Sequence, residues 1–209
     1  MTAATQAAPQ HLIHERIELR PFAAADAQAL LSLYADRDVM RYWNHAPWHS
    51  LEQAFTAIDD ARREYASGAS LHYAIEHRDS GALIGSCALY AISAGHRSAS
   101  LGYMLAKAHW GCGYLSEALE VLLGMAFRVL DLNRIEAEVD CRNTGSALAL
   151  RRFGFREEGC LREGWMVDGT GRDVFVHALL RSDWQAARAS RSCTRRTDCG
   201  IASSVHRTD

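Results

Sequence analysis

The chain of 209 residues is long enough for one domain with a full hydrophobic core. Its net charge of −2 and its charged fraction of 23% are ordinary for a soluble protein, so no DNA partner is expected. Residues 185–209 carry five Arg against two Asp, a balance of +3, which leaves −5 on the other 184 residues. This basic tail is predicted to be disordered; a contact with RNA or an acidic surface is the alternative.

Cysteine usage and hydropathy argue against a secreted, metal-binding or membrane protein. The six cysteines include no Cys-x-x-Cys pair, and neither they nor the ten histidines have zinc-ligand spacing, so no metal is expected. Residues 1–10 lack the basic and apolar regions of a secretory signal. The longest uncharged stretch, 80–96, is too short and too rich in Gly and Ser to span a bilayer. We therefore predict a cytoplasmic protein with reduced thiols and no membrane partner.

Hydrophobic periodicity predicts alternating strands and helices. In chain order we expect a strand at 16–20, a helix at 23–36, an aromatic loop at 41–49, a helix from Ser50 to 67, strands at 70–76, 82–92 and 99–105, a helix at 115–130, a strand at 134–141, a helix at 144–153, and strands at 156–167 and 173–180. This order predicts an α+β (mixed α/β) fold, in which about four helices flank a mostly antiparallel sheet of about seven strands. Residues 1–13 are interpreted as a disordered lead-in, 14–184 as the domain, and 185–209 as the tail.

A glycine-rich loop joins the predicted strand at 99–105 to a long amphipathic helix. Gly111 and Gly113 allow a tight turn, and the helix that follows offers free N–H groups and the positive end of its dipole. The sequence therefore predicts a phosphate site, although a simple tight turn is the alternative. No Gly-Lys-Ser/Thr follows the loop and no third glycine stands at the Rossmann spacing, so neither of those nucleotide sites fits.

The run from His109 to Ala118, HWGCGYLSEA, resembles the acyl-CoA loop of the GNAT acetyltransferases, and more narrowly that of the RimJ/RimL-like ribosomal-protein N-terminal acetyltransferases. The resemblance extends over about residues 14–184. Its other landmarks are 15–22 (ERIELRPF), 143–146 (NTGS), 153–155 (FGF), 158–159 (EG), 172–174 (RDV) and 183–184 (DW). Two positions depart from the usual pattern: Ala108 stands where many GNAT loops carry Arg or Gln, and His177 where Tyr is frequent.

The resemblance implies a GNAT-like fold with a splayed middle pair of strands and acetyl-CoA as cosubstrate. It implies that the pyrophosphate binds the backbone amides of Gly111, Cys112, Gly113, Tyr114, Leu115 and Ser116. The pantetheine arm would pair with Met104 and Leu105 and hydrogen-bond to Asn143. Asn143 is equally well interpreted as the N-cap of the helix at 144–153, and both roles are compatible.

Amide formation needs a neutral amine, a polarised thioester and a proton for the departing thiolate. Ser146 occupies the family position of the hydroxyl beside the thiolate; a first-turn helix serine is the alternative. Glu136 and Glu138 share one face of their strand, and either could remove the amine proton. We favour Glu138 because it lies nearer the end of the strand, although a solvated or ion-paired carboxylate is the simpler role for each.

The aromatic loop at 41–48 corresponds to the region that walls the acceptor site in the relatives, which makes Tyr42 and Trp43 candidate substrate contacts. Packing against the core is the alternative for its tryptophans. The acceptor would be a primary amine, either a protein N-terminus or a small amine, attacked in a ternary complex. A non-catalytic acyl-CoA-binding module is the competing function. The sequence leaves the oligomeric state open, with a homodimer as one alternative.

Overall fold

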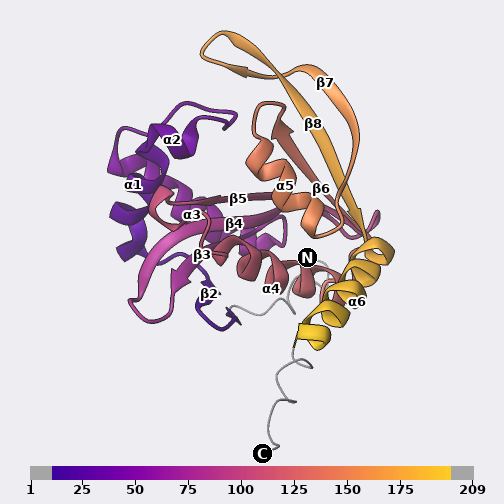
Figure 1. The fold of residues 1–209 in the computed structure, drawn as a ribbon. Helices are drawn as coiled ribbons and strands as arrows, with labels where there is room; N and C mark the ends of the chain where they lie inside the picture. The colour runs from indigo at the N-terminus through magenta and orange to yellow at the C-terminus, as the bar shows by residue number, and fades with distance from the viewer. Residues whose placement is uncertain (1–10, 199–209) are drawn as a thin grey trace, which may run out of the picture.

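An eight-stranded sheet organises residues 11–198, the part of the chain that the computed structural model describes, with side chains up to residue 189 (Figure 1). In sheet order the strands are β1 (Leu12–Ile13), β2 (Ile17–Arg20), β3 (Leu71–His77), β4 (Ala82–Ser93), β5 (Ser98–Leu105), β6 (Arg134–Asp140), β8 (Thr170–Leu180) and β7 (Arg156–Val167). Every neighbouring pair is antiparallel except β5 and β6. The predicted mixed α/β class with a mostly antiparallel sheet is therefore confirmed.

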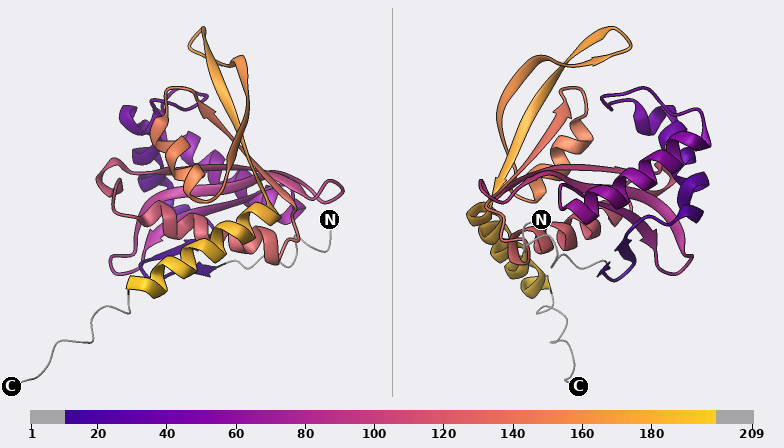
Figure 2. Two further views of the ribbon diagram at one scale, coloured as in Figure 1. Left: turned by 45° about the vertical axis from the view of Figure 1, so that its right-hand side comes forward. Right: turned by 180° about the vertical axis from the view of Figure 1, so that it is seen from behind.

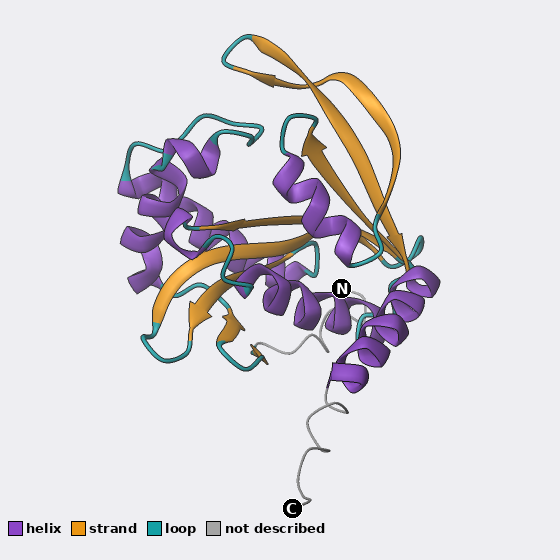
Figure 3. Ribbon diagram, in the orientation of Figure 1, coloured by secondary structure: helices purple, strands orange, loops and turns teal. Residues whose placement is uncertain are grey.

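Helices cover both faces of the sheet (Figure 3). They are α1 (Ala27–Ala35), α2 (Arg37–Met40), α3 (Leu51–Ser67), α4 (Tyr114–Arg128), α5 (Thr144–Arg152) and α6 (Arg181–Asp198), with short 3-10 turns η2 (Ala24–Asp26) and η3 (Lys107–His109). Helices α4 and α5 lie in front of the sheet in Figure 1, whereas α3 is in front in the view from behind in Figure 2. The main core lies between the sheet and α4, whose predicted stripe is buried: Leu119, Leu122, Leu123, Ala126 and Phe127.

Two predictions about the ends of the domain are wrong for the described residues. Residues 12–13, assigned to a disordered lead-in, form β1 and pair with β2, which brings the strand number to eight. Residues 185–198, assigned to a disordered tail, continue helix α6. The indole of Trp184 explains part of this helix, because it is buried against Phe127 with ring centroids 5.1 Å apart and lies beneath the guanidinium of Arg188. The remainder of both predictions, 1–10 and 199–209, lies outside the described residues.

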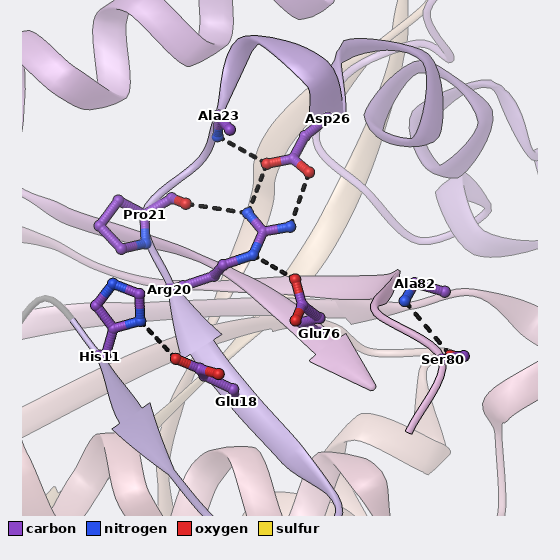
Figure 4. A network of polar contacts seen from close by, with 9 residues as sticks. All are labelled: His11, Glu18, Arg20, Pro21, Ala23, Asp26, Glu76, Ser80 and Ala82. Carbon is purple, nitrogen blue, oxygen red and sulfur yellow. Dashed lines mark hydrogen bonds and ion pairs between the residues drawn. The ribbon is translucent and has the colours of Figure 1, made fainter. Parts of the chain in front are cut away.

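The predicted helix at 23–36 is observed as the turn η2 followed by α1, and it ends at Asp36 as expected. Asp36 is extended, and its carboxylate accepts the backbone N–H of Asp38 at 2.8 Å, so a further short helix that was not predicted, α2, begins after it. At the other end of the segment, Arg20 donates to both carboxylate oxygens of Asp26, at 2.7 and 2.9 Å, and to Glu76 at 2.5 Å (Figure 4). This fork joins the first helical segment to strands β2 and β3.

The β7–β8 hairpin extends beyond the other strands at the top of Figure 1. Near its base, His177 on β8 pairs with Ala137 on β6 and Glu157 on β7, and its ring is completely buried. Burial lowers the pKa of His177, so the imidazole is neutral in the folded protein.

The neutral His177 should make the protein less stable in mild acid. The unfolded chain takes up a proton at this residue below pH about 6.5, whereas the folded chain resists it, so stability falls by up to about 1.4 kcal/mol per pH unit. We expect the melting temperature to fall less in the His177→Phe variant than in the wild type when the pH is lowered from 7.5 to 5.5. Thermal melts at both pH values measure the difference, and equal losses would contradict this account.

Candidate active site

The predicted phosphate loop lies between β5 and α4. Gly111 and Gly113 adopt φ of +74° and +88°, a left-handed conformation that favours glycine. The first bonds of α4 are donated by Ser116 and Glu117 to the carbonyl of Gly113. The backbone N–H groups from 111 to 115 therefore precede the helical ladder and are free to bind an anion at the positive end of the helix. The amide of Ser116 donates to the Gly113 carbonyl at 3.0 Å, and its contact with the pyrophosphate stays a prediction.

Arg16, just before β2, holds the loop from the side. Its Nη2 donates to the carbonyl of Cys112 at 3.0 Å, and its guanidinium lies 4.6 Å from the ring centre of Tyr114. Its Nε donates to Glu117 on α4 at 2.6 Å, and the Arg16 backbone N–H donates to the same carboxylate at 3.2 Å. Because Arg16 holds the Cys112 carbonyl, it limits how the loop backbone can turn. The sequence landmark at 15–22 thus has a physical role that the pattern alone did not reveal.

Strands β5 and β6 separate soon after they begin. Their parallel pairing runs only from Ser98 and Arg134 to Ser100 and Glu136. Beyond Ser100, β5 pairs with β4 alone, so its other edge is open towards the end of the strand. The predicted splayed pair is present. Among the residues predicted to bind the pantetheine there, Met104 and Leu105 have buried side chains, and the Leu105 carbonyl accepts the Trp110 indole N–H at 2.8 Å.

A hydrogen bond spans the gap between the separating strands. The hydroxyls of Tyr103 on β5 and Ser146 on α5 are 2.7 Å apart. Burial raises the pKa of Tyr103 to about 12, although the bond to Ser146 works in the opposite direction, so the phenol keeps its proton at neutral pH. Asn143 is the N-cap of α5, since its Oδ1 accepts the Ser146 N–H at 3.1 Å. One of its two predicted roles is thereby observed, and its contact with pantetheine stays a prediction.

A cleft of about 300 Å³ opens where the strands separate. Its walls bring together five of the predicted residues, namely Tyr42, Trp43, Glu138, Asn143 and Ser146. The lining also includes six further aromatic or imidazole side chains: Phe22, Tyr34, His72, Tyr90, Tyr103 and Trp165. The ring of Tyr34 stacks on Trp48 with centroids 3.9 Å apart, which fixes the end of the aromatic loop against α1. Residues 104–105 and 111–116 do not line this cleft.

The two glutamates of β6 have different surroundings. Both lie on the face opposite the buried Ile135, Ala137 and Val139, as the alternation predicted. Glu136 accepts from Arg134 at 2.7 Å, and Arg134 also forms a two-pronged ion pair with Glu158. Glu138 lines the cleft, and its Oε2 accepts the indole N–H of Trp165 at 2.9 Å. The carboxylate of Glu138 is therefore the one available to a ligand in the cleft.

Asp140 at the end of β6 joins the two sides of the cleft. Its side chain is fully buried and accepts two hydrogen bonds from the Arg142 guanidinium, at 2.8 and 2.5 Å. Burial alone would raise the pKa of Asp140, but Arg142 and the nearby Arg172 hold it below its ordinary value. Arg172 lies 3.8 Å away and donates to the carbonyls of Arg41 and Trp43 at 3.2 and 3.3 Å. This arginine fixes the aromatic loop relative to β6.

Several of these residues were not singled out for these roles by the sequence. The sequence assigned no role in the site to Trp165, Asp140 or Arg172. Arg172 belongs to the landmark at 172–174, the one signal that pointed to its segment. Among residues 11–189, whose side chains the structure describes, no group of three His, Cys, Asp or Glu side chains is arranged to hold a metal ion. No helix within residues 11–198 is long and apolar enough to cross a membrane.

Comparisons with known proteins agree with this geometry. Residues 16–156 match the acetyltransferase (GNAT) domain family. The uncharacterized N-acetyltransferase p20 of Bacillus licheniformis is 33% identical over 83% of this chain and 97% of its own. Mycobacterium smegmatis RimJ, solved in complex with CoA-disulfide, superposes with a TM-score of 0.75 at 28% identity, covering 86% of this chain and 90% of its own. Spermidine N-acetyltransferase of Vibrio cholerae, solved with CoA and spermine, gives 0.73 at 26%, covering 82% and 99%.

The fold and the loop define a CoA-dependent acyltransferase, and the chain belongs to the GNAT acetyltransferase family. Its relatives include RimJ, as expected for the RimJ/RimL-like branch. It is an N-acetyltransferase that moves the acetyl group of acetyl-CoA to an amine, which decides against a non-catalytic acyl-CoA-binding module.

The hold of Arg16 on the loop should be measurable in cofactor affinity. Arg16→Met keeps the aliphatic stem and the backbone N–H but removes the guanidinium bonds to the Cys112 carbonyl and Glu117, and we expect acetyl-CoA to bind about tenfold more weakly. Gly113→Val should have a larger effect, because φ of +88° strains any side chain and its Cβ would lie 3.1 Å from Arg16 Nη2. Isothermal titration with acetyl-CoA measures both.

Arg20→Met is the matched control, because it removes a nearby arginine, at the end of β2, whose partners, Asp26 and Glu76, lie away from the loop. We expect it to lower the melting temperature and leave the dissociation constant of acetyl-CoA unchanged. Equal losses of affinity in the two Met variants would show that Arg16 acts only through general stability.

Proposed function

We propose that the enzyme acetylates the N-terminal α-amino group of a polypeptide by direct attack in a ternary complex. One observation carries the choice of acceptor: the cleft offers a single available carboxylate, Glu138, among aromatic walls. Its other acidic residue, Asp140, is neutralised by Arg142 and Arg172. A polyamine such as spermine carries several ammonium groups and calls for several carboxylates. The likeness to a spermidine acetyltransferase therefore does not by itself assign a polyamine acceptor to this chain.

The basicity of the acceptor favours the same choice. An α-amino group has a pKa near 8, whereas an alkylamine such as the lysine side chain has a pKa near 10.4. At pH 7 about one α-amino group in ten is neutral, whereas only about one alkylamine in a few thousand is neutral. A single carboxylate acting through water is a sufficient base for the first. A small amine with one charge is the alternative acceptor, and it would use the same carboxylate.

In the proposed reaction the amine nitrogen attacks the thioester carbonyl carbon and the C–S bond breaks. Glu138 takes the amine proton through a water molecule, and Ser146 gives its hydroxyl proton to the CoA thiolate. Tyr103, protonated and 2.7 Å away, resupplies Ser146, and solvent returns a proton to Tyr103 as Glu138 releases the amine proton to solvent. Cys87 also lines the cleft, but burial raises the pKa of its thiol, which argues against an acyl-cysteine intermediate. The cytoplasmic location and the oligomeric state stay predictions.

The Ser146 hydroxyl should contribute to turnover rather than to cofactor binding. We expect Ser146→Ala to lower kcat by about 10²–10⁴-fold, the usual contribution of a positioned proton-transfer group, with the affinity for acetyl-CoA nearly unchanged. Stopped-flow detection of the released CoA thiol measures the rate. Near-normal turnover would assign protonation of the thiolate to Tyr103 or to water.

Thiol release with a panel of acceptors tests the proposed function. We expect kcat/KM to be highest for a peptide that has a free α-amino group and an uncharged first side chain. We expect it to be at least tenfold lower for spermidine and for the same peptide with a blocked N-terminus and a free lysine. Glu138→Gln should lower kcat for the preferred acceptor by about 10²–10⁴-fold.

Glu136→Gln is the control for this test, because it changes the same residue type on the same strand face, two positions from Glu138. Glu136 is already paired with Arg134, so we expect a change in kcat of less than threefold, roughly the effect of an exposed ion pair. A preference for spermidine would overturn the assigned acceptor, and equal effects of the two glutamine variants would overturn the assigned base.

A further inference from the structure

Strand β7 contains an irregularity that the proposed reaction does not by itself explain. Its pairing with β8 shifts register between Leu161 and Trp165. Within this bulge Glu163 has φ of +51°, a left-handed conformation that is uncommon for a residue with a side chain. Such strain persists only where neighbouring structure enforces it, and bulges often redirect a side chain next to a site.

Two residues of β8 hold the bulge in place. Asp173 accepts the backbone N–H of Glu163 through its Oδ1 at 2.9 Å. Gly171 provides space for the Glu163 side chain, since a Cβ on Gly171 would lie 2.8 Å from the Glu163 Cγ. The strained backbone is thus held by the hydrogen bond to Asp173, and the absence of a side chain at Gly171 leaves room for Glu163.

The bulge is followed at once by the residue that contacts the cleft. Trp165 pairs directly with Arg172, so the two side chains lie on the same face of the hairpin. Trp165 donates to Glu138 on β6, and Arg172 donates to the carbonyls of Arg41 and Trp43 in the aromatic loop. This cross-strand pair therefore contacts both walls of the cleft, Trp165 at β6 and Arg172 at the aromatic loop. Without the register shift, the residues beyond it would be displaced along β8 and this pairing would change.

We propose that Trp165 is a positioning residue for Glu138, and that the strained bulge in β7 serves to aim its indole N–H at Oε2 of that carboxylate. An indole is a donor only, so it can orient the carboxylate without competing for the amine proton. Among the described residues Trp165 is the one hydrogen-bond donor that reaches Glu138, and it leaves Oε1 to accept from the acceptor amine or its water. An otherwise exposed glutamate is thereby restricted before the substrate arrives.

This inference rests on the proposed role of Glu138, and a double-mutant cycle separates the two. Trp165→Phe keeps an aromatic ring in the wall but removes the N–H; we expect kcat to fall about tenfold, with KM for acetyl-CoA unchanged. In the Glu138→Gln background the same change should lower kcat less than twofold, because the group that Trp165 orients is already lost.

The outcomes of the cycle are distinct. An equal loss from Trp165→Phe in both backgrounds, or no loss in either while Glu138→Gln alone lowers kcat by about 10²–10⁴-fold, overturns the role of Trp165 and leaves Glu138 as the base. Full activity of Glu138→Gln overturns the proposed base itself. Melting temperatures of the four proteins show whether the variants fold alike.

Two further measurements do not depend on turnover by the Glu138 variant. In a ¹H–¹⁵N spectrum the indole signal that Trp165→Phe removes should shift in Glu138→Gln and stay in place in Glu136→Gln. Asp173→Ala frees the Glu163 N–H and should lower kcat by a similar factor as Trp165→Phe, with no additional loss in the double variant. The proposal would be contradicted if the indole signal did not shift in Glu138→Gln, or if the losses of kcat from Asp173→Ala and Trp165→Phe were additive in the double variant.

Discussion

The early end of the pairing between β5 and β6 is the constraint on which the site depends. Only the pairs from Ser98–Arg134 to Ser100–Glu136 form, and beyond them the two strands share no backbone hydrogen bonds. Buried backbone groups need partners, so an open strand edge inside a sheet is stable only if side chains or a ligand complete it. The hydrogen bond between Tyr103 and Ser146 partly closes this opening with side chains. The same separation leaves the β5 edge available to the pantetheine arm and forms the cleft in which Glu138 lies.

Charge is distributed so that the cleft keeps one carboxylate free. Asp140 is buried at the end of β6 and is compensated by Arg142 and Arg172, because an uncompensated buried charge would cost several kcal/mol. Arg172 uses its remaining donor capacity on the carbonyls of the aromatic loop, so the pair that neutralises Asp140 also builds the acceptor wall. Arg20 performs the corresponding structural task for Asp26 and Glu76 (Figure 4).

Local patterns predicted the elements and the loop, because they depend on nearby residues. The glycines at 111 and 113, the alternation in β6 and the Asn143 cap are all contained in short windows, and each was found where the pattern indicated. Glu138 differs from Glu136 in its hydrogen bond with Trp165, a residue 27 positions away in the sequence. This contact depends on the register shift in β7. Strand propensity does not reveal a register shift, so the contact could not be predicted from the sequence. The extension of α6 was missed because Trp184 is a single apolar anchor, which periodicity does not weigh.

In the bulge of β7, the conformational preference of one residue, Glu163, conflicts with the backbone that the fold imposes on it. Positive φ at Glu163 opposes the preference of a glutamate, and a glycine there would be less strained. Four other non-glycine residues, Ala91, Arg97, Asp131 and Asp168, also have positive φ, but the strain at Glu163 falls between Leu161 and Trp165, next to the one free carboxylate of the cleft. Strain persists where neighbouring structure enforces it, so strain that is held by Asp173 and admitted by Gly171 is evidence of a function for this part of β7. Two residues after Glu163 comes Trp165, and its indole reaches the carboxylate whose orientation decides whether the amine can lose its proton.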